Sequence, residues 1–515
     1  MTERLDAVII GAGLGGLAAG VTLAGHGRKV VVLEQQTVPG GYAQCFQRGP
    51  YRFDVSLHAL NGLAPGGGVD RLYRELGIWG RLRLHRLDPL YQLRLPDRMV
   101  TAYADWYRYE SELIGHFPAE AAGIRAYLDE AFAAHRDSRR MEEDQAAGRL
   151  PGLADFPARY PVLTRVSGET WEQMMSRHVA DARARSVLAA LWGYFGLPPS
   201  RLAAVMGAVA TASYHEHGGW YPEGGSGALS HVLAQVLRER GGEIRYGVLV
   251  TGVELNHERA VAVTTSDGQR LEADAFISNA SAPATMLEMV GRDRLPGDYV
   301  ARVADPAPSY TIFNVYLGLN RDVLGEKGLP HELFVSGSFS ADESWRAACR
   351  GDWEKASLGV TDYTRVDPGC APPGHAAVVL SAVASWDYED TWGTGGDLAG
   401  YQQNPGYLQI KKQVADGLIA RADAAVPGLA GAIEFREAST PLTNFRYTRN
   451  PRGAIEGYEN SPENSGLGWL PQETPIRNVF LAGAWTNTGG QNPAIASGAA
   501  AARLAMQVAP AHAHA

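Results

Sequence analysis

Apolar runs and helically spaced apolar positions alternate at the start of the chain. Residues Leu5 to Ile10 form a short β-branched apolar run, which is typical of a buried strand. A second apolar run extends from Lys29 to Leu33. Between the two runs, apolar positions recur at the spacing of a helix that ends near Gly25: Leu14, Leu17, Ala18 and Val21. The pattern predicts a strand–helix–strand unit of an α/β protein.

The same reasoning predicts further elements downstream. Residues 273–280 are typical of another buried strand, and the alternation from Tyr310 to Asn320 predicts a long strand of an antiparallel sheet. A short strand over Val479 to Leu481 precedes a glycine-rich turn and a helix of small residues. Residues 70–215 are helical in pattern, whereas residues 340–410 suggest strands and loops without an evident order. An amphipathic helix is predicted from the spacing of Leu229, Val232, Leu233, Val236 and Leu237.

Three glycines in the first predicted turn have the GxGxxG spacing of a dinucleotide-binding loop. Gly11 permits the tight turn, Gly13 lets backbone amides approach a pyrophosphate, and Gly16 lets the helix lie against the strand. Glu34 ends the second strand, where a carboxylate can accept hydrogen bonds from a ribose. The complete strand–loop–helix–strand–acid unit is far more specific than the glycines alone, and it predicts a dinucleotide cofactor.

The segment after Glu34 indicates which cofactor this is. It carries a Gly40-Gly41 turn, a basic residue and an FD pair followed by a histidine, in "VPGGYAQCFQRGPYRFDVSLH". The chain resembles the phytoene desaturase, carotenoid isomerase and retinol saturase group of flavoproteins, and these motifs look most like the saturase branch. The resemblance also covers "YPEGG", the strand residue Val248 and the C-terminal turn and helix. It implies FAD contacts at Gly11, Gly13, Gly16, Glu34, Gly40, Gly41, Arg48, Val248, Gly483, Gly490 and Ala494.

The resemblance implies a Rossmann-type FAD-binding domain that is discontinuous in sequence. We expect this α/β domain to comprise residues 1–70, 218–300 and 435–515. An inserted α+β substrate domain, with an antiparallel sheet and helices, would then comprise residues 71–217 and 301–434. No second GxGxxG with an acid occurs, so NADPH or NADH would dock transiently rather than in a domain of its own.

Composition narrows the classes of partner and compartment. Lysine and arginine number 47 against 56 acidic residues, a formal charge of −9, which argues against nucleic acid as a partner. Three widely spaced cysteines predict reduced thiols. Asp6 and Gly11 interrupt the early apolar run, and no apolar stretch reaches the length of a membrane span. We expect a cytoplasmic protein, with peripheral membrane contact and oligomeric state left open.

Four residues are candidates for proton transfer. His58 follows the FD pair, where the resembling saturases also carry histidine, and a histidine of near-neutral pKa can protonate a polyene carbon. The segment "YHEHGGWY" adds His215, His217 and Tyr221. If this segment is a strand, both imidazoles share one face. The pair lacks the further ligands that a metal centre needs, so no metal is predicted.

The resemblance leaves several functions open. A reductase would add hydride to a long apolar conjugated polyene, and one form of it is the NAD(P)H-driven reductive cyclase of polycyclic tetramate macrolactam biosynthesis. A phytoene-type desaturase would remove hydrogen, and a carotenoid cis–trans isomerase would cause no net redox change. A flavin-free prenyl-binding escort, like GDP-dissociation inhibitors, is the alternative from another class. We expect reduction, because the first sixty residues look most saturase-like.

Overall fold

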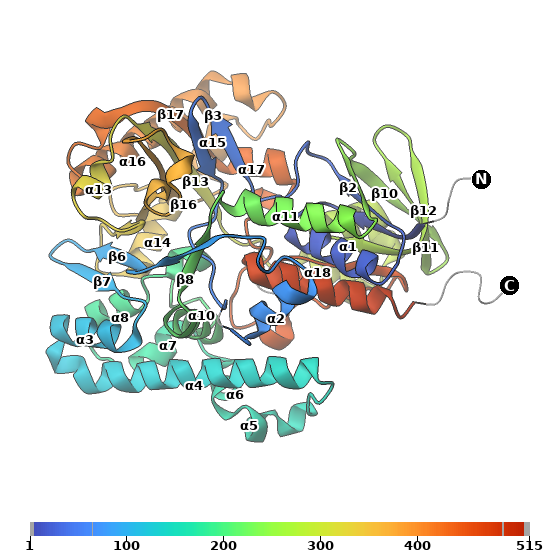
Figure 1. The fold of residues 1–515 in the computed structure, drawn as a ribbon, viewed down its shortest axis with the longest axis horizontal. Coiled ribbons are helices and arrows are strands. Elements are labelled where there is room, and N and C mark those ends of the chain that lie inside the picture. The colour runs from blue at the N-terminus through green and yellow to red at the C-terminus, as the bar shows by residue number, and fades with distance from the viewer. Residues whose placement is uncertain (1–4, 64, 487–488, 509–515) are drawn as a thin grey trace.

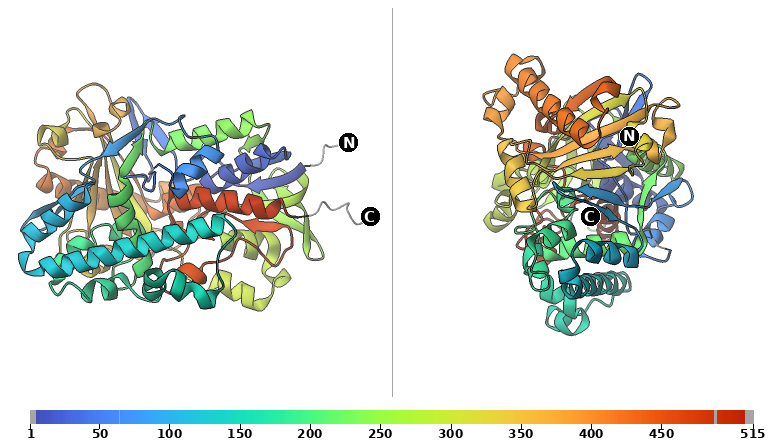
Figure 2. Two further views of the ribbon diagram at one scale, coloured as in Figure 1. Left: turned by 60° about the horizontal axis from the view of Figure 1, so that its bottom comes forward. Right: turned by 90° about the vertical axis from the view of Figure 1, so that its left-hand side faces the viewer.

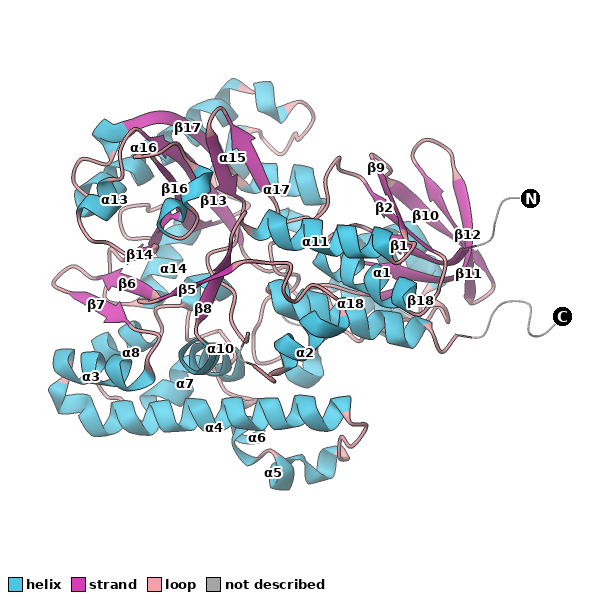
Figure 3. Ribbon diagram, in the orientation of Figure 1, coloured by secondary structure: helices cyan, strands magenta, loops and turns pink. Residues whose placement is uncertain are grey.

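Two seven-stranded sheets organise the part of the chain that the computed structural model describes, which is residues 5–63, 65–486 and 489–508. The sheets lie at opposite ends of the long axis, and helices fill the space between and below them (Figures 1 and 3). The fold is therefore mixed α/β, with one mainly parallel and one largely antiparallel sheet, as the sequence predicts.

The first sheet is assembled from three distant stretches of the chain. Its strands run in the order β10-β11-β12-β1-β2-β9, and β18 pairs with β12. Pairing is parallel from β18 through β12, β1 and β2 to β9, and antiparallel in the β10–β11–β12 extension. The strands are β1 (Leu5–Ile10), β2 (Val30–Glu34), β9 (Glu243–Tyr246), β10 (Val250–Asn256), β11 (Arg259–Thr265), β12 (Arg270–Ser278) and β18 (Val479–Leu481).

Three helices pack together beside this sheet. Helix α1 (Leu14–Gly25) contacts both α11 (Ser226–Glu239) and α18 (Gln491–Ala505). Nearly every residue of α1 is buried, which explains its small, apolar composition. The first helix thus lies between elements that are more than 200 and more than 450 positions further along the chain (Figure 1).

The second sheet has the order β17-β13-β16-β15-β14-β6-β7. All its neighbours are antiparallel except β14 and β6. Helix α16 (Pro405–Ala425) contacts β13, β15 and β16 of this sheet. The strands are β6 (Tyr91–Arg94), β7 (Met99–Ala102), β13 (Thr311–Leu319), β14 (Glu332–Val335), β15 (Leu358–Asp362), β16 (Ala376–Ala384) and β17 (Ile433–Ser439).

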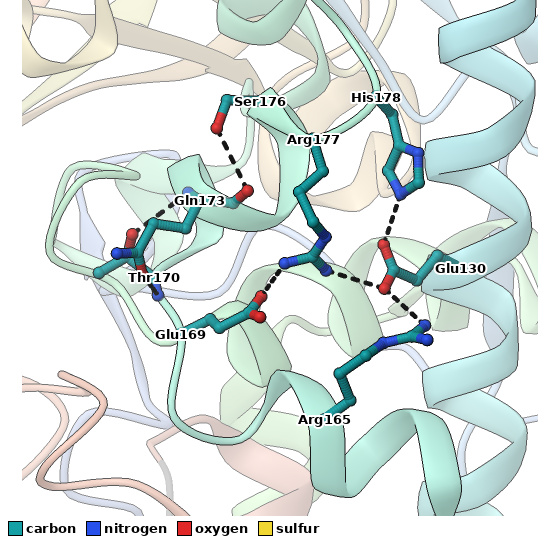
Figure 4. A network of polar contacts seen from close by, with 8 residues as sticks. All are labelled: Glu130, Arg165, Glu169, Thr170, Gln173, Ser176, Arg177 and His178. Carbon is teal, nitrogen blue, oxygen red and sulfur yellow. Dashed lines mark hydrogen bonds and ion pairs between the residues drawn. The ribbon is translucent and has the colours of Figure 1, made fainter.

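A helical layer occupies one side of the molecule, and the long α4 (Ala121–Ala146) runs along it (Figure 2). Helix α10 (Ala204–His217) packs on α4. Glu130 of α4 accepts hydrogen bonds from Arg165, Arg177 and His178, so one carboxylate ties two segments of the chain to this helix (Figure 4). The layer also contains α3 (Trp106–His116), α5 (Phe156–Arg159), α6 (Pro161–Val166), α7 (Trp171–Ser176), α8 (Ala182–Leu188) and α9 (Trp192–Phe195).

Shorter elements connect the sheets. Strands β3 and β4 form a hairpin, and β5 pairs with β8. The connecting elements are α2 (Gly68–Glu75), β3 (Cys45–Arg48), β4 (Tyr51–Asp54), β5 (Leu84–Leu87), β8 (Gly219–Pro222), α12 (Gly297–Ala304), α13 (Val323–Glu326), α14 (Ala341–Arg350), α15 (Glu389–Gly393) and α17 (Pro441–Thr448).

Most of the elements predicted from sequence are present. The strands expected at Leu5–Ile10 and Val479–Leu481 have those bounds, and the long strand expected from Tyr310 is β13, with antiparallel neighbours. The division into domains stays a proposal; β17, which crosses its boundary at residue 435, pairs with β13 of the second sheet. Among the described residues, no helix is both long and apolar enough to span a membrane.

Candidate functional site

One large cavity, of about 2610 Å³, extends from the first sheet to the second. The glycine loop, the end of β2 and the start of α18 contribute to its wall at one part. Helices α9 and α10 and strand β14 contribute elsewhere. A volume well above the 300–1,000 Å³ of ordinary ligand pockets suits a large cofactor together with a long ligand.

The glycine loop is closed against the end of strand β12. A Cβ atom at Gly16 would overlap with the carbonyl oxygen of Gly11, so α1 can start at this distance from β1 only if residue 16 is glycine. A Cβ at Gly13 would likewise overlap with the side-chain amide of Asn279. Gly11 and Gly13 line the cavity, whereas Gly16 does not; its role is the helix–strand packing that the sequence predicts for it.

Glu34 is buried at the end of β2 and lines the cavity. Its carboxylate accepts hydrogen bonds from the backbone amides of Ala12, at 2.7 Å, and Gln36, at 2.8 Å. Burial raises its pKa above the ordinary value, and these amide hydrogen bonds act in the opposite direction. The backbone amide of Val248 donates to the Glu34 carbonyl at 2.8 Å, which brings Val248 to the same edge of the cavity.

Two glycine-rich turns complete this part of the cavity. The amide of Gly40 donates to the carbonyl of Ala12 at 2.8 Å, so the Gly40-Gly41 turn lies directly on the glycine loop. Both residues have positive φ and line the cavity. From the far end of the chain come Gly483, Gly490 and Ala494, which also line it. Gly490 is the N-cap of α18, whose free backbone amides favour an anionic ligand.

His58 lies on the cavity wall in contact with a buried carboxylate. Its Nδ1 is 2.8 Å from Oε2 of Glu332 and 2.9 Å from the hydroxyl oxygen of Thr361. The ring stacks on Tyr194 with centroids 5.3 Å apart. Burial opposes a charge on the imidazole, but the attraction and hydrogen bond of Glu332 outweigh it and raise the pKa of His58. The pair therefore favours a protonated imidazole beside the cavity.

Glu332 itself is a candidate site residue that the sequence analysis missed, because its carboxylate contacts His58. Its side chain is 1% exposed, and despite burial its pKa is lowered, mainly by the charge of His58. The sequence did contain a signal for this residue, because Glu332 is a single acid in the otherwise apolar strand β14. A buried acid in a strand indicates a partner of opposite charge.

Comparison with known proteins decides the class of this site. The family described as flavin-containing amine oxidoreductase matches residues 14–506. The chain belongs to this family. It is accordingly an FAD-dependent oxidoreductase, and the predicted resemblance to the desaturase, isomerase and saturase flavoproteins is confirmed at low identity.

The relatives of this chain are named for different activities. Prolycopene isomerase 1, chloroplastic, of an Oncidium hybrid cultivar is 24% identical over 493 residues, covering 93% of this chain and 80% of the relative. All-trans-retinol 13,14-reductase of Danio rerio is 24% identical and covers 93% and 82%. Phytoene desaturase (lycopene-forming) of Pseudescherichia vulneris is 25% identical and covers 96% and 97%.

A solved structure supports the fold. An oxidoreductase from Methanosarcina mazei superimposes with a TM-score of 0.62 at 16% sequence identity, covering 96% of this chain and 99% of that one. The residues around the first part of the cavity fit FAD. The buried Glu34, a loop in which a Cβ has no room and the start of α18 all border one space, as a dinucleotide with a pyrophosphate requires.

Three residues expected at the site lie away from the cavity. Arg48 is about half exposed on β3, where its guanidinium pairs with Glu437 at 2.7 Å. Tyr221 is buried and donates its hydroxyl hydrogen to Asp54 at 2.9 Å. Neither residue is part of the cavity wall, nor is His215. The contacts of Arg48 and Tyr221 are with other protein side chains outside the cavity and do not support their assignment to the site.

His215 and His217 both belong to helix α10, so the strand arrangement in which the two imidazoles would share one face does not apply. Residues two apart on a helix point about 200° apart, so the imidazoles face opposite sides rather than one. His215 stacks on Tyr109 with centroids 4.2 Å apart, and burial lowers its pKa to about 4. His217 lines the cavity.

Glu456 is an acid on the cavity wall that the sequence analysis did not single out. A Cβ at Gly489 would overlap with its side chain, which places Glu456 beside the turn that leads into α18. Burial raises the pKa of Glu456 to about 8. At neutral pH this carboxyl group is protonated and can donate a hydrogen bond or a proton.

Proposed function

We propose that this protein is a reductase that adds hydrogen across a double bond of a long apolar conjugated polyene, with NADPH or NADH as the hydride source. The ring-closing form of that reaction, as in polycyclic tetramate macrolactam biosynthesis, is included in the proposal. FAD would contact the residues that border the first part of the cavity: Gly11, Gly13, Glu34, Gly40, Gly41, Val248, Gly483, Gly490 and Ala494.

The second part of the cavity supports an apolar substrate. Its wall is rich in aromatic and apolar side chains from α9, α10 and β14, which include Trp192, Tyr194, Phe195, Met206, Tyr214 and Phe334. Such groups bind a hydrocarbon by removing apolar surface from water, and they keep water away from the reacting carbons. The retinol, phytoene and prolycopene in the relatives' names are molecules of this class.

The observation that carries the reductive direction is the His58–Glu332 pair. Reduction of one carbon–carbon double bond requires a hydride at one carbon and a proton at the other. Glu332 raises the pKa of His58, so the imidazole is held as an acid, which suits proton donation to carbon. Desaturation would need a base at this place instead. Bound FAD supplies the hydride chemistry, and the chain's residues supply position, a dry cavity and the proton.

The direction is tested by mass spectrometry of the product. Purified protein with bound FAD is incubated without oxygen with NADPH and a panel of polyenes, among them retinol, phytoene and prolycopene. A gain of two hydrogens, absent without NADPH, is the expected result. In a parallel incubation without NADPH, in which the oxidised flavin is the electron acceptor, a loss of two hydrogens would make the protein a desaturase. An unchanged mass with altered retention would make it an isomerase; either outcome refutes the proposed reduction.

A further inference from the structure

The long helix α4 and helix α10 bring two histidines and a carboxylate together at the cavity wall. Helix α4 contributes His135, and α10 contributes Glu216 and His217. One ligand atom from each lies within 4.8 Å of the other two. Nε2 of His135 is 2.9 Å and Nε2 of His217 is 3.7 Å from the same oxygen, Oε2 of Glu216.

The imidazoles of this cluster are buried, and in the described part of the chain Nδ1 of His217, which is 3.5 Å from the hydroxyl oxygen of Ser213, is the one of their ring nitrogens with a hydrogen bond. His135 is 5% exposed as a residue, and the His217 side chain is also 5% exposed. Within the described residues, neither ring nitrogen of His135 has a hydrogen bond, and Nε2 of His217 has none. A buried nitrogen without a partner costs stability, so native proteins rarely leave one. Two such nitrogens that face one carboxylate indicate a ligand between them.

The charges around the cluster are compatible with a cation. A neutral imidazole offers a ring-nitrogen lone pair to a metal ion, and the carboxylate of Glu216 supplies negative charge beside both rings. A positive group also contacts the cluster: the guanidinium of Arg139 donates to Oε1 of Glu216 at 3.0 Å. That bond orients the carboxylate and leaves Oε2 facing the imidazoles, although its charge weakens cation binding.

We propose that His135, Glu216 and His217 bind a divalent transition metal ion of the zinc type. Two imidazoles and one carboxylate are a common ligand set of zinc sites that keep a fourth position open. Metal–ligand bonds of about 2.0–2.2 Å place tetrahedral ligand atoms about 3.3 Å apart, between the 2.9 Å and 3.7 Å seen here. His135 and His217 line the cavity, so the open position faces the space where a substrate oxygen or a water molecule can bind.

The proposal does not depend on the redox reaction and is tested without turnover. Holoprotein with bound FAD is dialysed against a chelator, and binding of Zn²⁺ is then measured by calorimetry, with the bound metal determined by elemental analysis. We expect one zinc ion per chain. His135→Ala and His217→Ala should weaken binding by about 100-fold or more, because even groups behind the ligands are worth 10–100-fold.

A matched control and a second measurement keep the result interpretable. His116→Ala removes an imidazole that also pairs with a glutamate, Glu112 at 3.3 Å, but has no second imidazole beside it; its zinc binding should equal that of the wild type. If an alanine variant loses FAD, His217→Gln replaces it, since glutamine keeps the volume. Zinc should also raise the melting temperature of the wild-type protein and not that of His217→Gln. Absence of stoichiometric zinc, or equal binding in all variants, overturns the proposal.

Discussion

The pKa of His58 depends on Glu332, which lies 274 positions further along the chain. Burial alone would lower the pKa of this imidazole, as it does for His215. The carboxylate of Glu332 reverses the effect, because a buried ion pair at 2.8 Å stabilises the protonated ring more than burial destabilises it. Two histidines in similar surroundings thus differ in charge because only one has an acidic partner.

Replacement of Glu332 should shift the pH dependence of the proposed reaction. The raised pKa of His58 means that its acid form is present at low pH and is lost as the pH rises through that value. Glu332→Gln keeps the shape but removes the charge, so burial dominates and activity should be lost at lower pH.

His58→Ala should reduce turnover by about 100-fold or more, the contribution of a general acid.

Pre-steady-state reduction of substrate across pH 5–9 measures both variants, with FAD content as the check on folding. Glu456, whose pKa is about 8, also titrates in this range. Glu456→Gln therefore serves as the control. It should not change the pH at which activity is lost through deprotonation of His58. A profile that Glu332→Gln does not move would return the pair to a purely structural role.

Glu34 should contribute to FAD retention through its buried carboxylate. We expect Glu34→Ala to weaken FAD binding by about 1–3 kcal/mol, the scale of a hydrogen bond to a charged group. The substitution would also remove the hydrogen bond that the backbone amide of Ala12 donates to the Glu34 carboxylate at 2.7 Å. Glu34→Gln retains an acceptor and should lose less. Flavin fluorescence titration of the apoproteins measures the difference; equal affinity in all three proteins would contradict the assignment of Glu34.

At the scale of elements, the cofactor site depends on how closely two helices approach. Helix α18 lies against α1 so tightly that a Cβ at Gly498 would overlap with the carbonyl oxygen of Gly15. Since Gly15 belongs to the first turn of α1, this contact sets the distance between the glycine loop and the start of α18. The small residues of α18 are therefore a requirement of packing and of the site together.

Two glycine-to-alanine variants in helices should have opposite effects. Gly498→Ala should lower the melting temperature and the FAD content, because the new methyl group pushes α18 away from α1; overpacking typically costs about 1–3 kcal/mol. Gly417→Ala in α16 meets nothing within 4 Å and should stabilise the protein by about 0.4–1 kcal/mol. Thermal unfolding and the ratio of flavin to protein absorbance measure both. Similar behaviour of the two variants would show that the α1–α18 contact is not tight.

At the scale of the whole molecule, one cavity connects the parallel sheet with the second sheet. The first part of its wall consists of segments near residues 11–41, 248 and 483–494, so cofactor binding joins both ends of the chain. A ligand that binds only the folded state stabilises it by an amount that grows with the logarithm of the free ligand concentration above the dissociation constant. FAD binding should therefore stabilise the complete fold rather than one loop.

The apoprotein should gain about 2.7 kcal/mol of unfolding free energy when free FAD is 100 times its dissociation constant. FMN lacks the adenosine half that would reach Glu34 and Val248, and it should stabilise less at the same concentration. Denaturant unfolding at several concentrations of each flavin measures the two effects. Equal stabilisation by FMN and FAD would refute the placement of the adenosine half at the β2 edge.

Much of the fold was predictable because it depends on contacts between neighbours in sequence. The turn from β1 into α1 and the acid at the end of β2 follow from glycine spacing and an apolar run, which act over a few residues. The helical pattern of residues 70–215 reaches His215, but the place of His217 in the same helix was left open, because alternation over four residues cannot distinguish a strand from the last turn of a helix.

The sequence by itself determined a dinucleotide-binding α/β fold and its likeness to polyene-modifying flavoproteins, because those signals are local motifs. Only the tertiary structure decided which distant groups meet: Glu332 with His58, Glu456 with the turn before α18, and His135 with His217. The physical reason is that these pairs are set by the order of strands and the packing of helices. A pKa or a metal site depends on distances of a few ångström, which spacing along the chain does not encode.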